Sequence, residues 1–179
     1  PISEKVLLHL KDQVHHLKRL DSGVWHTRIE GDLEGASYSY LHKINGKWIE
    51  VHDPSALSSD VNSGNSYVID LDKIKKPIKR AKTQLNPTEA VIYEMSVRDF
   101  SMQKEAGFSY PGKFASLSES PVVHGQKFDL DYLKELGISH VQLLPVYDFG
   151  SVDEKHPELV YNWGYDPVQY NVPDGSFAS

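Results

Sequence analysis

Two short apolar segments constrain the fold of this chain more than any other feature. Residues 90–97 and 139–146 are apolar nearly throughout, which is typical of parallel strands buried on both faces. Between them, residues 128–137 repeat apolar side chains at helical spacing and end on a glycine, a common helix stop. Strand, crossover helix and strand form a βαβ unit, so the second half of the chain predicts a parallel sheet with a covering helix.

The first half of the chain predicts an antiparallel fold. Apolar and polar residues alternate over several short stretches, as they do in half-buried strands. Asn45 and Gly46 favour a tight hairpin turn. Several strands at this spacing predict a small β-sandwich of the immunoglobulin type. The strands are expected at residues 5–10, 24–30, 36–44, 47–51 and 67–71.

A basic stretch separates the two halves. Residues 73–82 hold six Lys and Arg residues with Pro77 among them. An anionic partner is one interpretation of this stretch. A solvated linker is favoured, because like charges repel and proline discourages a helix. We place the domain boundary near Leu85, which divides the chain into residues 1–84 and residues 85–179.

Charge and composition exclude several classes of protein. The 179 residues carry a formal net charge of −6, which argues against a general nucleic-acid binder. No apolar run reaches the roughly 20 residues that span a bilayer, so no membrane partner is expected. The chain has no Cys, and therefore neither a disulfide nor a thiolate nucleophile. The compartment stays open, with the cytoplasm favoured over secretion.

Residues 161–167 are the strongest functional signal, since they read Tyr-Asn-Trp-Gly-Tyr-Asp-Pro. Aromatic faces beside amide and carboxylate groups suit sugars, because a pyranose has apolar C–H faces and a hydroxyl rim. Gly and Pro indicate a shaped loop, where binding groups often lie. The alternative is an aromatic corner that only packs a loop against the core.

This string closely resembles the hallmark of the type I pullulanases, which are debranching enzymes of the α-amylase superfamily. Four further segments resemble that family in the expected order: the first barrel strand, the first barrel helix, the second strand and the segment that follows the hallmark. The resemblance spans the whole chain and is strongest from about Pro87 onward. The segments are residues 90–100, 128–138, 139–149 and 171–177.

The resemblance implies a β-sandwich of the starch-binding type over residues 1–84 and the start of a catalytic (β/α)₈ TIM barrel over residues 85–179. A complete barrel needs about 250 residues, so we expect an internal fragment. The family hydrolyses α-1,6 branch linkages in pullulan, amylopectin and glycogen-type α-glucans with retention, and the missing C-terminal part of the same protein is then an expected partner. Isoamylases and branching enzymes differ at the hallmark and rank lower.

The family's catalytic carboxylates lie on later barrel strands, so no catalytic residue is assigned and the fragment is expected to be inactive. Arg98 and Asp99 resemble part of the nucleophile strand only superficially, and Asp99 is expected to be a residue at the end of the first strand. By resemblance, Tyr165 stacks beneath the sugar ring at the scissile bond and Asp166 reaches a hydroxyl or a basic partner. The remaining substrate-binding candidates shape the loop or contact sugar: Tyr161, Asn162 and Trp163.

A second class of function is a non-catalytic α-glucan-binding module in which the sandwich binds sugar. Trp25 and Trp48 are its candidate aromatic platform, although Trp25 shares a face with Ile29 and core packing is favoured for it. No metal site and no cofactor are predicted, and calcium is considered only for the intact parent. Asp70 and Asp72 are two carboxylates without a defined loop, which is a poor calcium signal.

Overall fold

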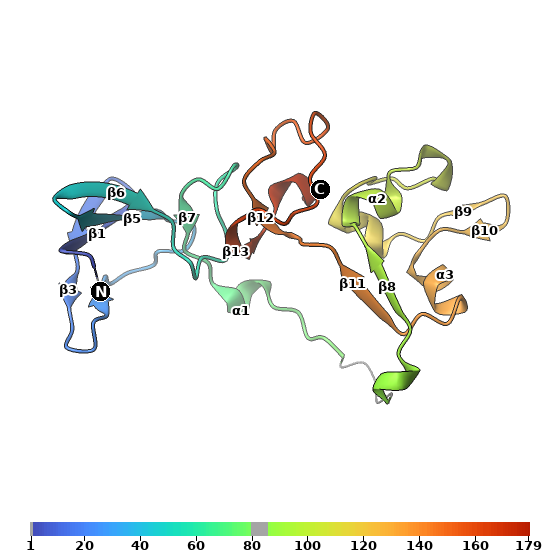
Figure 1. The fold of residues 1–179 in the computed structure, drawn as a ribbon, viewed down its shortest axis with the longest axis horizontal. Helices are drawn as coiled ribbons and strands as arrows, with labels where there is room; N and C mark the ends of the chain where they lie inside the picture. Colours follow the sequence, from blue (N-terminus) through green and yellow to red (C-terminus); the bar gives the residue numbers. More distant parts are fainter. Residues whose placement is uncertain (1, 80–85) are drawn as a thin grey trace.

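A five-stranded antiparallel sheet forms the first part of the protein (Figure 1). The computed structural model describes residues 2–79 and 86–179. The strand order is β2-β1-β5-β6, and β7 pairs with the first two residues of β5, Ser37 and Tyr38. The strands are β1 (Lys5–Leu10), β2 (Gln13–His16), β5 (Ser37–Ile44), β6 (Lys47–Val51) and β7 (Ser66–Tyr67).

The predicted hairpin is confirmed, because β5 and β6 pair in antiparallel fashion around Asn45 and Gly46. Both turn residues have positive φ, at 51° and 75°, as a tight turn of this type requires. The predicted strand at residues 24–30 is wrong for most of its length. Only β4 (Trp25–His26) is hydrogen-bonded, in a two-residue ribbon with β3 (Lys18–Arg19).

The strand expected at residues 67–71 is also shorter than predicted. Tyr67 ends β7, and Leu71 begins the short helix α1 (Leu71–Ile74). Asp70 is the cap of that helix, since its carboxylate accepts a hydrogen bond from the Asp72 amide at 3.0 Å. The basic stretch continues from α1 without regular structure up to residue 79. The domain boundary near Leu85 lies outside the described residues.

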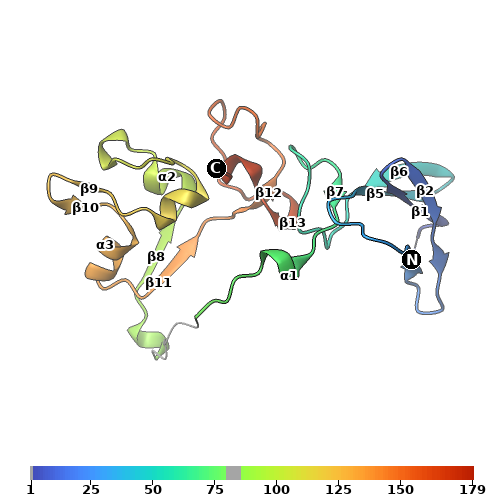
Figure 2. The same ribbon diagram turned by 180° about the vertical axis from the view of Figure 1, so that it is seen from behind.

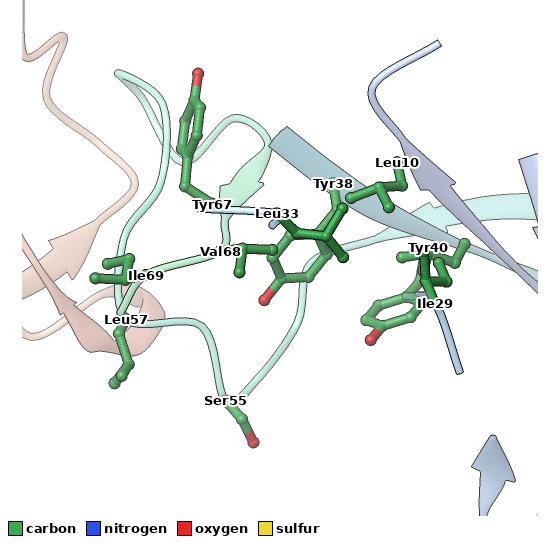
Figure 3. Close-up of a pocket in the computed structure, with 11 residues that line it drawn as sticks. Leu10, Ile29, Leu33, Tyr38, Tyr40, Ser55, Leu57, Tyr67, Val68 and Ile69 are labelled. Carbon is green, nitrogen blue, oxygen red and sulfur yellow. The ribbon is translucent and has the colours of Figure 1, made fainter. Parts of the chain in front are cut away.

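The core of the first part lies on one face of the sheet. Leu8, Leu10 and Ala36 are buried there, and side chains from the following loops pack on them. Leu8 and Leu10, with side chains from these loops, line an open pocket of about 310 Å³ (Figure 3). The partly buried residues of this cluster are Leu17, Ile29, Leu33, Tyr38, Tyr40 and Val68.

The predicted parallel pairing in the second part is confirmed. Strand β8 (Ile92–Met95) runs parallel to β11 (His140–Leu143), with Ile92 opposite His140. Helix α3 (Leu130–Glu135) lies on the crossover between them. The helix ends where predicted, because Gly137 adopts a φ of 82° and its amide bonds the Lys134 carbonyl.

The expected burial of both strands is wrong for the described residues. Ile92 in β8 is 61% exposed, and every residue of β11 is exposed. The reason is that a sheet of two strands is too narrow for the other described residues to cover both of its faces, and parallel strands are buried only where both faces are covered. Val97 leaves the sheet altogether and begins helix α2 (Val97–Ser101).

A strand pair at the centre of the molecule connects the two parts. Figures 1 and 2 show β12 (Tyr147–Phe149) and β13 (Pro167–Pro173) between the five-stranded sheet and the β8–β11 pair. A second core cluster lies beside them, formed by Val97, Phe149, Val152 and Phe177. The long connection after α2 is held by short turns. These are η2 (Lys104–Ala106), η3 (Phe114–Ser118) and the ribbon of β9 (Val122–Val123) and β10 (Gln126–Lys127).

Two further 3₁₀ turns lie next to strands β8 and β13. They are η1 (Pro87–Glu89), ahead of β8, and η4 (Gly175–Phe177), which follows β13 and contributes Phe177 to the second core cluster. Within residues 2–79 and 86–179, no helix has the length and apolar character that crossing a membrane requires.

Candidate functional site

The aromatic segment found in the sequence lies at the end of a long loop between β12 and β13. The loop is closed at its base, where the Gly150 amide donates to the Asp166 carbonyl at 3.1 Å. Gly164 adopts a φ of 83°, and a Cβ at this position would lie 2.7 Å from the carbonyl oxygen of Pro145. Only glycine combines this backbone conformation with so close an approach, so Gly164 fixes the loop against the end of the β11 segment.

A network of polar side chains holds the loop in shape. The Asn162 side-chain amide donates to Asp166 at 2.9 Å and to the Ser151 hydroxyl at 2.8 Å. Its carbonyl oxygen accepts from the Gly164 amide at 2.7 Å. Ser151 in turn donates to the Asp166 carboxylate. The hydrogen bond from Ser151 lowers the pKa of Asp166, and the bond from Asn162 adds to this effect against a smaller desolvation cost, so Asp166 is a carboxylate at neutral pH.

Tyr161 is anchored to helix α2. Its hydroxyl donates to Asp99 at 2.6 Å, and Arg98 lies 5.2 Å from its ring centre. The hydrogen bond to Asp99 raises the pKa of Tyr161, with burial and the Asp99 charge as further causes. The expectation that Asp99 ends the first strand is wrong, because Ser96 caps α2 and Asp99 lies in its first turn. Asp99 thus has a role in the loop that the sequence did not indicate.

Two aromatic rings project from the loop into solvent. Tyr165 is 63% exposed and Trp163 is 62% exposed. Trp163 meets the ring of Tyr161 edge to face, with the ring centres 6.1 Å apart. The five predicted residues therefore divide into two groups. Tyr161, Asn162 and Asp166 are engaged by protein partners, whereas Trp163 and Tyr165 leave their faces open.

A groove of about 280 Å³ runs beside the loop. Most of its other lining residues are apolar, and its polar lining residues are Arg98, Lys113, Glu158, Asn162 and Ser176. Lys113 is fixed by a hydrogen bond to the Ser176 carbonyl at 2.8 Å. Exposed aromatic faces next to a groove with charged and amide groups suit a polyhydroxylated ligand.

A cluster of three carboxylates includes one residue of this loop, and the sequence did not predict it. Oxygens of Asp148, Glu154 and Asp174 lie within 4.8 Å of one another. The three residues come from β12, the loop and the turn after β13, so their sequence spacing of 6 and 20 residues gives no motif. Only the fold brings them together.

The platform proposed for a binding module finds less support in the geometry. Trp48 is exposed on β6, as an open platform requires, while Trp25 is half-buried on β4. No aromatic contact joins these two residues in the described part of the chain. Tyr38 and Tyr40 instead meet edge to face over the sheet pocket, 5.9 Å apart, and Tyr67 extends away from them (Figure 3). Burial and the Asp53 carboxylate, which accepts from the Tyr38 hydroxyl at 2.7 Å, raise the Tyr38 pKa.

Comparisons with known proteins point to one group of carbohydrate-active enzymes. The pullulanase of Bacillus subtilis (strain 168) is 40% identical over 167 residues, which are 91% of this chain and 23% of that protein. The solved pullulanase of Anoxybacillus sp. LM18-11, complexed with maltotetraose, superposes with a TM-score of 0.93 at 38% identity over the whole chain. Pullulanase from Bacillus acidopullulyticus gives a TM-score of 0.93 at 36% identity. No family model matches the chain.

These similarities establish homology to glycoside hydrolases of the debranching class. In particular, the chain is a homologue of the pullulanases, over roughly a quarter of their length. It covers 27% of the Anoxybacillus protein and 24% of the Bacillus acidopullulyticus protein. The observed fold, antiparallel sheets with a short parallel pair, is thereby matched to a part of the pullulanase structure.

Proposed function

We propose that this chain contributes a substrate-contacting loop to an enzyme that hydrolyses α-1,6 branch linkages in pullulan, amylopectin or glycogen-type α-glucans. The observation that carries the proposal is the loop of residues 161–166, whose backbone is locked by Asn162 while Trp163 and Tyr165 stay open. The Anoxybacillus pullulanase, part of which superposes on this chain, has been crystallised with maltotetraose and with maltotriose, which supports a maltooligosaccharide as the ligand.

In this proposal Tyr165 is the stacking residue for a glucose ring. Stacking buries C–H surface and fixes the position of the ring, so it contributes orientation as well as affinity. Trp163 offers a second face, and the ionised Asp166 accepts from a sugar hydroxyl at the loop base. Tyr161 and Asn162 hold the loop in place for these contacts, since both are already bound to Asp99, Ser151 or Asp166.

The proposed domain layout assigns residues 1–84 to a starch-binding-type β-sandwich and residues 85–179 to the opening of a (β/α)₈ barrel. The five-stranded antiparallel sheet supports the first assignment, and the β8–α3–β11 unit supports the second. The rest of a pullulanase-like barrel is then the natural partner of the second part, because it would cover the exposed faces of β8 and β11.

Hydrolysis with retention needs a carboxylate nucleophile and an acid about 5–5.5 Å apart across the scissile bond. By resemblance, those groups belong to later barrel strands than the two found here. We therefore expect no hydrolysis by this chain alone. Incubation with pullulan and an assay for reducing ends should give no signal above a heat-denatured control, and clear turnover would contradict this expectation.

Binding to maltotetraose tests the proposed loop. We expect Tyr165→Ala to weaken binding in calorimetry by roughly fivefold, since an aromatic contact of this kind contributes about 1 kcal/mol. Tyr170→Ala is the matched control, because Tyr170 is 68% exposed and lies on β13 against Tyr147 rather than in the loop. If Tyr165→Ala binds as well as the parent chain, the loop is not the sugar site.

The same titration distinguishes the loop site from a binding module on the sheet of the first part. Loss of maltotetraose binding in Trp48→Ala with full binding in Tyr165→Ala would place the affinity on the sheet of the first part. That result would replace the loop proposal with a non-catalytic α-glucan-binding module.

A further inference from the structure

Asp99 joins the aromatic loop to helix α2 through both oxygens of its carboxylate. Oδ2 accepts from the Tyr161 hydroxyl at 2.6 Å, and Oδ1 accepts from Nη1 of Arg98 at 3.1 Å. Arg98 also lies over the ring of Tyr161, 5.2 Å from its centre. Each of the three side chains therefore contacts the other two. Charge-assisted hydrogen bonds and a cation over an aromatic face are both directional, so this set of contacts fixes the orientation of the Tyr161 ring.

The orientation of Tyr161 determines where the two open rings of the loop lie. Trp163 meets Tyr161 edge to face, with the ring planes at 90°, which is a preferred arrangement of an aromatic pair. Asn162 accepts from the Gly164 amide at 2.7 Å, so the backbone from Tyr161 to Gly164 is one tight turn. A displacement at Tyr161 is therefore passed on to Trp163 and to the adjoining Tyr165.

The internal bonds of the loop fix its shape rather than its position. Asn162, Ser151 and Asp166 bond one another, and all three lie between β12 and β13, so they move together with the loop. Gly164 holds the loop against the segment ahead of β12. Asp99 belongs to the helix that follows β8, and its bond to the loop spans 62 residues. It therefore places the loop relative to the parallel strand pair.

The bond between Tyr161 and Asp99 contributes little to the stability of the chain. The Asp99 side chain is 47% exposed, and Tyr161 is 45% exposed. Water competes for both groups, and exposed polar contacts of this kind are worth little in unfolding free energy. Loss of the Asp99 carboxylate should therefore move the loop without unfolding the protein.

We propose that Asp99 is a positioning residue of the sugar site, which places Trp163 and Tyr165 through Tyr161 without contacting the sugar itself. This inference rests on the proposed function, because it takes a maltooligosaccharide as the ligand of the loop. It adds a side chain from outside the loop on which the affinity depends. A stacking ring has to lie along the face of the sugar, so a displaced ring loses contact and orientation together.

A double-mutant cycle with maltotetraose tests the proposal. Asp99→Ala and Tyr161→Phe should each weaken binding in calorimetry by roughly two- to fivefold, no more than loss of the Tyr165 ring. The double variant should bind no more weakly than either single variant, because both changes remove the same hydrogen bond. Asp99→Asn keeps an acceptor oxygen and should recover most of the affinity. Circular dichroism and urea unfolding establish that each variant is folded.

Asp131→Ala is the matched control. Asp131 also lies in the first turn of a short helix, α3, and its side chain is 54% exposed and pairs with Lys134. The variant therefore loses an equivalent helical carboxylate that has no contact with the aromatic loop, and it should bind maltotetraose like the parent.

Tryptophan fluorescence gives a measurement that needs no sugar. The chain has three Trp residues, so Trp25→Phe with Trp48→Phe leaves Trp163 as the single reporter. In that background, Asp99→Ala and Tyr161→Phe should lower the fluorescence anisotropy of Trp163, because its ring loses a fixed neighbour. Asp131→Ala should leave the anisotropy unchanged.

Two results would overturn the inference. Unchanged Trp163 anisotropy in Asp99→Ala would mean that Asp99 does not place the loop. Additive losses of affinity in the cycle would mean that Asp99 affects the sugar by another route, such as direct contact. A parent chain that does not bind maltotetraose would instead overturn the proposed function, and the anisotropy would still decide whether Asp99 places the rings.

Discussion

Gly164 is the residue on which the shape of the aromatic loop depends most directly. We predict that Gly164→Ala destabilises the chain by more than the roughly 1–2 kcal/mol of a left-handed alanine, because the new Cβ would also meet the Pro145 carbonyl. Gly137→Ala is the control, since Gly137 has nearly the same φ of 82° and a Cβ added there would meet nothing within 4 Å. Urea unfolding of both variants measures the difference. Equal losses would mean that the contact with Pro145 relaxes without cost.

Glu154 gives a residue-scale prediction for pH dependence. Burial raises its pKa above the ordinary value of 4.5. At pH values between the pKa in the unfolded chain and the raised pKa in the native state, the native state therefore binds more protons than the unfolded chain. Stability contributed by this group therefore falls as pH rises through that window and is recovered below it. Glu154→Gln should be more stable relative to the parent at pH 7 than at pH 4. Urea unfolding at both pH values checks this, with Glu105→Gln, on the exposed turn η2, as the reference. A relative stability that does not change with pH would contradict the burial effect.

At the scale of elements, helix α3 depends on its cap. Asp129 is buried and accepts from the Tyr132 amide at 2.9 Å, and the helix has only six residues. We predict that Asp129→Ala lowers the free energy of unfolding by about 0.5–2 kcal/mol, whereas Asp129→Ser keeps a capping oxygen and loses less. Chemical denaturation of the two variants measures both losses in the free energy of unfolding. If serine is as harmful as alanine, burial of the carboxylate matters more than the cap.

Local pattern was enough to predict those elements that are set by their own residues. The parallel pairing of β8 and β11, the glycine stop after α3 and the hairpin at Asn45 all follow from periodicity or turn chemistry. The strand expected at residues 24–30 failed for a different reason. Its side chains alternate in exposure as predicted, but only Trp25 and His26 find a partner strand, and no local signal reports the presence of a partner.

The candidate site also has one part that could be predicted from the sequence and one part that could not. The segment of residues 161–167 is contiguous, so its aromatic and polar character was visible in the sequence. The hydrogen bond between Tyr161 and Asp99 joins residues that are 62 positions apart in the chain. The carboxylate cluster joins Asp148 to Asp174, which are 26 positions apart. Such contacts depend on how β12 and β13 cross the molecule, which spacing along the chain does not encode.

At the scale of the whole molecule, the two parts are held together by a small number of polar contacts. The side-chain amide of Asn62 donates to Asp153 at 3.0 Å, and its carbonyl oxygen accepts from the Glu154 amide at 2.8 Å. On the far side of the joint, Asn171 donates to the Pro54 carbonyl at 2.9 Å. Since each contact spans about 90 residues or more, they stabilise the arrangement of the parts rather than either part alone.

Removing the Asn62 side chain should therefore uncouple the two parts without unfolding them. Asn62 has a φ of 59°, so Asn62→Gly keeps the backbone conformation and deletes only the two side-chain bonds. We expect thermal unfolding to broaden or separate into two transitions. Asn45→Gly is the control, because Asn45 also has positive φ but lies in the β5–β6 hairpin, so glycine there adds the same chain entropy without touching the joint. A sharp single transition in Asn62→Gly, matching that of Asn45→Gly, would show that the backbone contacts and the carboxylate cluster suffice to couple the parts.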